Sequence, residues 1–352
     1  MKNSISFRFL FVLLLFSSCR KEQPIDPPAS PDSEEVIESI VFNVILPSYL
    51  AVKNKAIELE EAATLFRENP GNSTWVGLQK TWSAAHISWQ HTEGFAFGPV
   101  QDEALRLTID SWPIDVQMIN QIILGSEDLS IEALASKPGS VKGFHAMEYL
   151  LWGLSGHKSI EDFSERELEY LSNLAILVKN DVSNLYDAWT PSAGNYAGTI
   201  VENTNTDLPD NQAVLLRIVD ALKSAAGDLG DRKIGNPFLQ EDTLKLESRM
   251  SANSKADFIA NLESIENIYL GQYFGEEYGQ GISTLVVSQN APLNTSIKRL
   301  IEQTKSDIEF LPFDFSKAIL ELPYNISSIQ EQVKKLEGLL AVEVRTIINN
   351  LE

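Results

Sequence analysis

An imidazole and a carboxylate, those of His145 and Glu148, stand three residues apart in the otherwise apolar segment 143–153 (GFHAMEYLLWG). On a helix, positions i and i+3 share a face, so both side chains would point the same way. Burying the two together is costly unless a partner such as a metal ion offsets the lost hydration. The pair therefore predicts a metal or catalytic site, although the same spacing fits a buried histidine hydrogen-bonded to a carboxylate.

The residue types near this pair differ from those of a familiar zinc peptidase. In HExxH, two histidines at i and i+4 bind zinc, with the glutamate between them. Here Tyr149 stands four residues after His145, and no HExxH occurs in the chain. A site with one imidazole and several carboxylates suits a hard or borderline cation such as iron, manganese or calcium, and zinc less well. The expected cofactor is a divalent metal ion.

Two other stretches supply carboxylates that could complete such a site. Trp89 and Glu93 are four residues apart and would share a face of a helix expected to end at Gly94. Asp110 lies a few residues before Pro113. Each carboxylate has a structural alternative, because Asp110 could cap a helix opened by Pro113 and Glu93 could be a charge exposed at a helix end. The sequence leaves these alternatives open.

The elements that must position these residues are helices. Apolar residues recur every three or four positions through most of the chain, and runs of alternating β-branched residues are scarce. This pattern predicts an all-α fold built from bundle-like groups of helices. The expected helices cover residues 34–68 with a bend or break at Pro47, 74–91, 140–152, 165–189, about 209–227, 255–270, 295–310 and 326–351.

The segment 190–210 is rich in Gly, Pro, Asn and Thr, and a loop of that length is usually functional or a boundary. We expect it to separate an N-terminal helical bundle, residues 34–195, from a C-terminal helical bundle, residues 205–352. A body of about 320 residues is long enough for one large or two ordinary domains.

Residues 1–19 (MKNSISFRFLFVLLLFSSC) have the features of a secretory signal, with an apolar run too short to span a bilayer. Cys19 is the only cysteine and follows two serines, as the lipidated residue of a bacterial lipoprotein does. An ordinary cleaved signal with an incidental cysteine is the alternative. The proline-rich segment 20–33 is typical of a flexible linker. We expect a lipid-anchored cell-envelope protein, either periplasmic or at the outer membrane.

The net charge of the chain indicates which classes of partner it is poorly suited to bind. The chain has 49 acidic and 28 basic residues and a formal net charge of -21. Such an acidic protein is a poor candidate for binding nucleic acid or an anionic membrane face. We therefore expect no nucleic-acid partner, and membrane contact only through the lipid anchor.

The motifs together resemble those of the imelysin family, which is also classed as an insulin-cleaving metallopeptidase family. Its GxHxxE motif is matched by Gly143, His145 and Glu148, and its W…E…FGPV and IDxWP segments are matched at 89–100 and 109–113. A second-half pattern of the family is matched by Glu247, Ser248, Ser251, Ser254, Asp257, Phe258, Asn261, Asn267, Tyr269 and Gly271. Where the family would place an arginine between Trp82 and Trp89, this chain departs from the pattern near His86.

The resemblance implies two helical bundles with the GxHxxE helix near their interface, and an exported protein linked to bacterial iron uptake. Iron is then the favoured metal, with zinc and calcium still open, and iron-uptake components of the cell envelope are the expected protein partners. The implied interface pocket contains Trp89, Gly143, Trp112, Glu247, Ser251 and Asp257. Helix capping by Ser254 is an alternative explanation for part of the 251–261 segment.

Three functions follow from these observations. The favoured one is a metal-binding uptake lipoprotein that holds a divalent cation with His145, Glu148, Glu93 and Asp110. The second is a metallopeptidase that uses His145 and Glu148 on zinc, which is less expected because the ligand set departs from hydrolytic zinc geometry. The third is a non-catalytic helical binding protein in which the motif only braces the structure.

Overall fold

The computed structural model describes residues 32–102, 105–273, 276–277 and 279–351. These residues are mostly helical, and a pair of two-residue strands, β1 (Gln272–Tyr273) and β2 (Glu276–Glu277), is the only sheet among them. The predicted all-α fold is therefore confirmed. The predicted signal sequence, Cys19 and most of the predicted linker lie outside the described residues. Pro31–Glu352 form one compact unit, so the division into two bundles stays a prediction.

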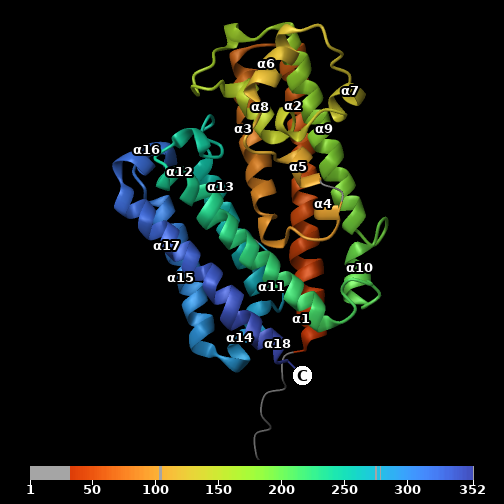
Figure 1. Ribbon diagram of the computed structural model, residues 1–352. Coiled ribbons are helices and arrows are strands. Elements are labelled where there is room, and N and C mark those ends of the chain that lie inside the picture. Colours follow the sequence, from red (N-terminus) through yellow and green to blue (C-terminus); the bar gives the residue numbers. More distant parts are fainter. Residues whose placement is uncertain (1–31, 103–104, 274–275, 278, 352) are drawn as a thin grey trace, which may run out of the picture. The chain divides into compact units, whose positions relative to one another are not determined.

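Three long helices form the frame of the first half of the chain (Figure 1). The first of them, α2, packs against the other two, α3 and α9. Their bounds are Leu46–Glu68 for α2, Asn72–Gln90 for α3 and Glu165–Trp189 for α9. A capping box between Ser164 and Glu167 starts α9, as the pairing of a serine with a glutamate three residues later predicts.

The expected bend at Pro47 takes the form of a change in helix type. The short helix α1 (Ser33–Ser39) continues into the π-helix η1 (Ile40–Ile45), and α2 follows with Pro47 as its second residue. A proline is tolerated in the first turn of a helix because its missing N–H would have no partner there. The run Ser33–Glu68 is long and apolar enough to cross a membrane by length and composition. Half of that apolar window is buried in the protein, as in a core helix.

Short elements connect α3 to α9 and carry part of the candidate site. They are η2 (Glu93–Phe95), α4 (Pro99–Asp102), α5 (Leu105–Ile109), α6 (Val116–Leu124), α7 (Ile131–Ala135), η3 (Gly139–Val141), α8 (Gly143–Trp152) and η4 (Ile160–Asp162). The expectation of a helix opened by Pro113 is wrong. The helix begins at Val116 instead, because the side chain of Asp115 accepts a hydrogen bond from the backbone N–H of Met118 and caps it.

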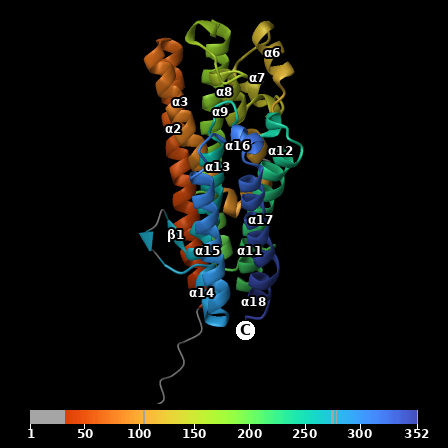
Figure 2. The same cartoon turned by 90° about the vertical axis from the view of Figure 1, so that its left-hand side faces the viewer.

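The second half supplies a further group of packed helices (Figures 1 and 2). Helix α13 contacts α3 of the first half as well as α11 and α15 of the second, so it lies between the two groups. The elements are α10 (Tyr196–Val201), α11 (Asn211–Gly227), the π-helix η5 (Asp228–Gly235), α12 (Asn236–Leu239), η6 (Thr243–Lys245), α13 (Ser254–Leu270), α14 (Ile282–Gln289), α15 (Ala291–Glu309), α16 (Phe315–Glu321), α17 (Pro323–Leu339), the π-helix η7 (Leu340–Val344) and α18 (Arg345–Asn349).

Candidate metal centre

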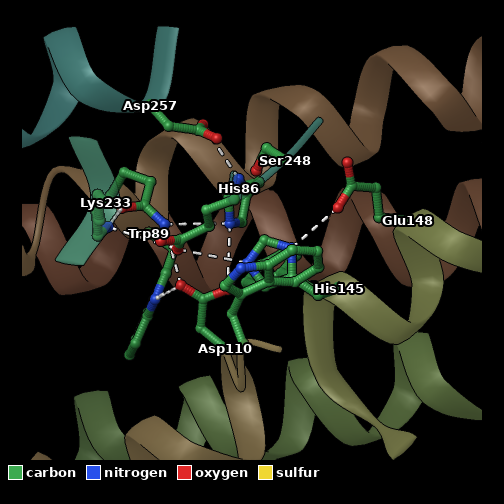
Figure 3. Close-up of polar contacts among 12 residues, drawn as sticks. His86, Trp89, Asp110, His145, Glu148, Lys233, Ser248 and Asp257 are labelled. Atoms are coloured by element: carbon green, nitrogen blue, oxygen red, sulfur yellow. Dashed lines mark hydrogen bonds and ion pairs between the residues drawn. The ribbon is translucent and has the colours of Figure 1, made fainter. Parts of the chain in front are cut away.

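Two histidines and an aspartate from separate elements meet in the interior (Figure 3). His86 comes from α3, Asp110 follows α5, and His145 comes from α8. One potential ligand atom from each residue lies within 4.8 Å of those of the other two. Both histidine side chains are fully buried and that of Asp110 is 4 % exposed. The group differs from the predicted ligand set because it contains two imidazoles and one carboxylate.

The carboxylate of Asp110 occupies the centre of this group. Its Oδ1 lies 3.2 Å from Nε2 of His86 and 3.1 Å from Nε2 of His145. Its Oδ2 accepts hydrogen bonds from Nε1 of Trp89 at 2.9 Å and from Nε2 of Gln90 at 3.0 Å. These contacts fix the orientation of the carboxylate and direct one oxygen at both imidazoles. Asp110 therefore does not cap a helix, the structural alternative that the sequence left open.

The ring of His145 is oriented by Glu148, as their spacing on one helix predicts. Oε2 of Glu148 lies 3.0 Å from Nδ1 of His145. A carboxylate in this position keeps the proton on Nδ1 and leaves the lone pair of Nε2 available to a metal. The other oxygen, Oε1, accepts hydrogen bonds from the backbone N–H and the hydroxyl of Ser251 at 2.9 and 2.8 Å. Both oxygens of Glu148 are thus engaged.

His86 has an equivalent carboxylate partner from the second half of the chain. Its Nδ1 lies 3.1 Å from Oδ1 of Asp257, which also accepts a hydrogen bond from Asn253. The imidazole is stacked on Trp82, with ring centroids 4.9 Å apart. Sequence reasoning missed His86 as a site residue. The available signal was the 82, 86, 89, 93 spacing, which places His86 on the face of α3 that carries the two tryptophans.

Burial and neighbouring charges act in opposite directions on the two imidazoles. Burial lowers the pKa of His86, but the carboxylates of Asp257 and Asp110 together outweigh it and raise that pKa to about 10. Burial likewise lowers the pKa of His145, while Asp110 and the other carboxylates raise it well above the ordinary value. Burial raises the pKa of Asp110, but the two imidazoles hold it well below its usual range. The metal-free site therefore favours protonated imidazoles beside ionised carboxylates.

A second charged group borders His145. Oε1 of Glu247 lies 3.4 Å from Nε2 of His145 and 3.5 Å from Nζ of Lys233, and Oε2 lies 3.4 Å from the guanidinium of Arg232. Burial raises the pKa of Glu247, but Lys233 and the other cations hold it far below its usual range. Both basic residues lie on the π-helix η5. Such widened turns are frequent at functional sites.

Four buried polar atoms around the cluster have no hydrogen-bond partner among the described residues. They are Nε2 of His145, Oε2 of Glu247, Oγ of Ser248 and Oδ2 of Asp257. Although Nε2 of His145 is close to two carboxylates, the angles do not fit a hydrogen bond. Ser248 also has a φ of 56°, which is strained for a residue other than glycine. Buried polar atoms without a hydrogen bond fit a site that holds a further ligand.

Of the remaining residues predicted for the site, Trp112 and Gly143 lie close to His145, whereas Glu93 lies outside the group of ligand atoms. Trp112 lies with its ring 4.9 Å from that of His145, and Gly143 starts α8 against the backbone of Ile109. A Cβ on Gly143 would lie 2.3 Å from the Ile109 carbonyl oxygen, and the φ of Gly143 is +76°, so only glycine permits this approach. Glu93 is not in the cluster of ligand atoms: it is buried and accepts a hydrogen bond from Arg106 at 2.5 Å.

The ligand types and the free Nε2 of His145 fit a transition metal. Two imidazoles and one carboxylate form the set that ferrous iron takes in non-haem sites with open coordination positions. The carboxylates bonded to the outer ring nitrogens of both histidines supply the supporting contacts that metal-bound histidines ordinarily make. The arrangement is therefore a possible site for a divalent cation.

Comparison with known proteins decides the family. The sequence profile of the imelysin family matches residues 45–342. The chain belongs to the imelysin family. One relative, iron-regulated protein A of Synechococcus elongatus, is 28% identical over 265 residues, which cover 74% of this chain and 69% of that protein. The match confirms the family predicted from the four motifs.

Two solved structures share the fold with this imelysin-family chain. One, described as an iron-regulated protein A precursor from Parabacteroides distasonis, has a TM-score of 0.81 at 23% identity and is matched over 91% of this chain and 97% of that one. The other, an imelysin-like protein from Psychrobacter arcticum, has a TM-score of 0.74 at 14% identity over 90% of this chain and 95% of that one. At these identities the likeness establishes the all-α architecture.

Proposed function

We propose that this imelysin-family protein binds a divalent cation, ferrous iron foremost, through His86, Asp110 and His145, and serves iron uptake at the cell envelope. The observation that carries the proposal is the convergence of two imidazoles on one oxygen of Asp110. Nδ1 of each imidazole contacts a carboxylate, that of Asp257 for His86 and that of Glu148 for His145. A bound metal would take the place of the protons that the raised pKa values of His86 and His145 favour in the metal-free protein.

The charges of the side chains around His86, Asp110 and His145 favour a bound cation. The side chains of four carboxylates around the cluster are at most 4 % exposed, and among the described residues Lys233 and Arg232 are the lysine and arginine side chains that pair with any of them. The carboxylates are those of Asp110, Glu148, Glu247 and Asp257. Buried negative charge in such excess must be balanced by protons or by a metal ion. Two protons and one dication supply equal charge, so the site can exchange one for the other.

Iron is favoured over zinc and calcium for two reasons. Two imidazoles suit a borderline transition metal better than calcium, which takes oxygen ligands. A relative that is 28% identical is named iron-regulated protein A. The apolar N-terminal segment and Cys19 support placement in the cell envelope with a lipid anchor, where components of an iron-uptake system would be its partners.

The roles of Glu148 and Glu93 differ within this proposal from those that the sequence suggested. Glu148 orients His145, since ligation by Glu148 would require its Oε1 to leave Ser251. Glu93 would have to leave Arg106 to reach a metal. A metallopeptidase is less well supported, because a zinc hydrolase needs a carboxylate free to act as base and Glu148 has both oxygens engaged.

Anaerobic calorimetry of the metal-stripped protein with ferrous, zinc and calcium ions tests the proposal. We expect ferrous iron to bind, and His145→Ala and His86→Ala to abolish binding. His91→Ala is the matched control because His91 lies just past the end of α3, and its Nε2 contacts Glu263 instead of the cluster. Absence of metal binding by the wild type, or unchanged binding in His145→Ala, would refute the proposal.

A further inference from the structure

Lys233, on the π-helix η5, is a buried lysine beside the candidate metal centre, with 2 % of its side chain exposed (Figure 3). Its Nζ donates a hydrogen bond to Oε1 of Gln90 at 2.7 Å and lies 3.5 Å from Oε1 of Glu247. Nε2 of Gln90 donates in turn to Oδ2 of Asp110 at 3.0 Å. The oxygen of Glu247 that faces Lys233 also lies 3.4 Å from Nε2 of His145. One intervening side chain therefore separates the ammonium from each of these two proposed ligands.

The contact with Lys233 determines the orientation of the Gln90 amide. An ammonium group only donates hydrogen bonds, so the atom of Gln90 that faces it must be the oxygen. The same oxygen accepts a second hydrogen bond from Nδ2 of Asn261 at 2.7 Å. The amide NH₂ must then point to Asp110, where it engages Oδ2 and leaves Oδ1 directed at the two imidazoles. Lys233 thus acts on the proposed ligand Asp110 through Gln90.

Lys233 also places a permanent positive charge where a dication is expected. Burial lowers the pKa of Lys233, but Glu247, foremost among the nearby carboxylates, outweighs burial and holds that pKa above its ordinary value. The side chain is therefore an ammonium at neutral pH. Its charge offsets part of the negative charge that the carboxylates around the cluster present to a metal, and it repels the metal directly.

We propose that Lys233 limits the affinity of the centre for a divalent cation, so that the ion held by the two histidines and Asp110 can be released again. This inference rests on the proposed function, because it concerns the regulation of that same site. The ammonium acts across Gln90 and Glu247, the side chains that separate it from the ligands. A protein that serves uptake must pass its ion on, and differences in affinity between variants of one site lie mostly in the dissociation rate.

A purely structural role for Lys233 is the alternative, in which it only neutralises Glu247 and fixes Gln90. The two roles predict opposite changes in metal affinity when the ammonium is removed. Loss of a structural contact would misplace Asp110 through Gln90 and lower the affinity. Loss of a repelling charge raises the affinity, because the carboxylates then attract the dication more strongly.

Calorimetric titration of the Lys233→Met variant with Mn²⁺, as a divalent probe, tests the inference, since methionine is an unbranched side chain without charge. We expect the affinity to rise on the order of tenfold and the dissociation rate, measured after addition of excess chelator, to fall. Lys179→Met is the matched control. Lys179 on α9 lies 3.1 Å from Glu60 on α2, in an ion pair that shares no residue with the metal cluster, so its loss should leave the affinity unchanged.

The double variant Lys233→Met/Glu247→Gln, compared with Glu247→Gln alone, keeps the test decisive if Lys233→Met does not fold, because removal of both charges avoids a buried carboxylate that has lost its lysine. Replacing Lys233 in this background should again raise the affinity for Mn²⁺ on the order of tenfold. An unchanged or lower affinity on replacement of Lys233 in either background would overturn the inference. Failure of the proposed function would appear differently, as absence of Mn²⁺ binding by the wild type.

Discussion

Oε2 of Glu148 lies 3.0 Å from Nδ1 of His145, and this contact determines which ring nitrogen faces Asp110. The three-residue spacing on α8 makes the contact possible, and Ser251 holds the carboxylate from the other side. Glu148 would therefore act on a bound metal through His145.

Replacing Glu148 with Gln should lower metal affinity about 10- to 100-fold, the usual effect of losing a carboxylate behind a metal-bound histidine. The amide can still accept a hydrogen bond from His145, so the fold should remain intact. Calorimetric titration with Mn²⁺ measures the affinity, and circular dichroism checks the helix content. Ser251→Ala should have a smaller effect of the same sign, and an equal or larger one would contradict the assigned role.

Replacing His86 with Ala should abolish metal binding and also destabilise the metal-free protein by about 3–5 kcal/mol, because Asp110 and Asp257 would be left buried without their shared partner. Chemical denaturation of the metal-free protein measures the free energy of unfolding. The paired control is His91→Ala, which should retain metal binding. A stable His86→Ala protein that binds metal normally would exclude His86 from the site.

Metal binding should release about two protons at pH 7.5, because the raised pKa values of His86 and His145 keep both imidazoles protonated in the metal-free protein. The folded-state pKa of His86 is about 10, above its unfolded value of 6.5. Its contribution to stability is therefore complete below about pH 6.5 and is lost as pH rises toward 10. Affinity for the metal should rise over the same interval. Calorimetry in buffers of different ionisation enthalpy counts the protons, and release of none would contradict the assignment.

Replacing Gly143 with Ala should destabilise the protein by about 1–3 kcal/mol, because the positive φ is strained for alanine and the added Cβ would press on the carbonyl of Ile109. His145 should also move relative to Asp110, so metal affinity should fall. Thermal denaturation and Mn²⁺ titration measure the two effects. Gly77→Ala on α3 is the control: a Cβ there meets nothing within 4 Å, and the helix should be stabilised by about 0.5–1 kcal/mol.

Replacing Glu93 with Gln should leave metal affinity within about threefold of the wild type, because Glu93 pairs with Arg106 and lies outside the cluster of ligand atoms. The same titration with Mn²⁺ makes the comparison. A loss as large as that in His145→Ala would show that Glu93 moves onto the metal, as the sequence suggested.

Much of the fold follows from the sequence because helical periodicity is a local property. The long helices α2, α3, α9, α13 and α15 occupy the segments in which apolar residues recur every three or four positions. Their ends were less predictable. The segment after Asp110 contains Pro113, yet the helix starts at Val116, where the side chain of Asp115 supplies the cap.

The site was predictable only in part, because most of its contacts join distant segments. The contact of His145 with Glu148 lies within one helix, so spacing alone predicted it. The contact of His86 with Asp257 joins residues 171 positions apart, and nothing in the sequence around His86 indicates a partner at that distance. Glu93 appeared to be a ligand because Arg106, its partner, lies in a different element.

Exchange of two protons for one dication leaves the total charge of the protein unchanged. The loaded and empty forms would then present the same long-range electric field, so a partner could not recognise loading by electrostatic attraction. It would have to detect a change in position, such as a shift of α8 or η5.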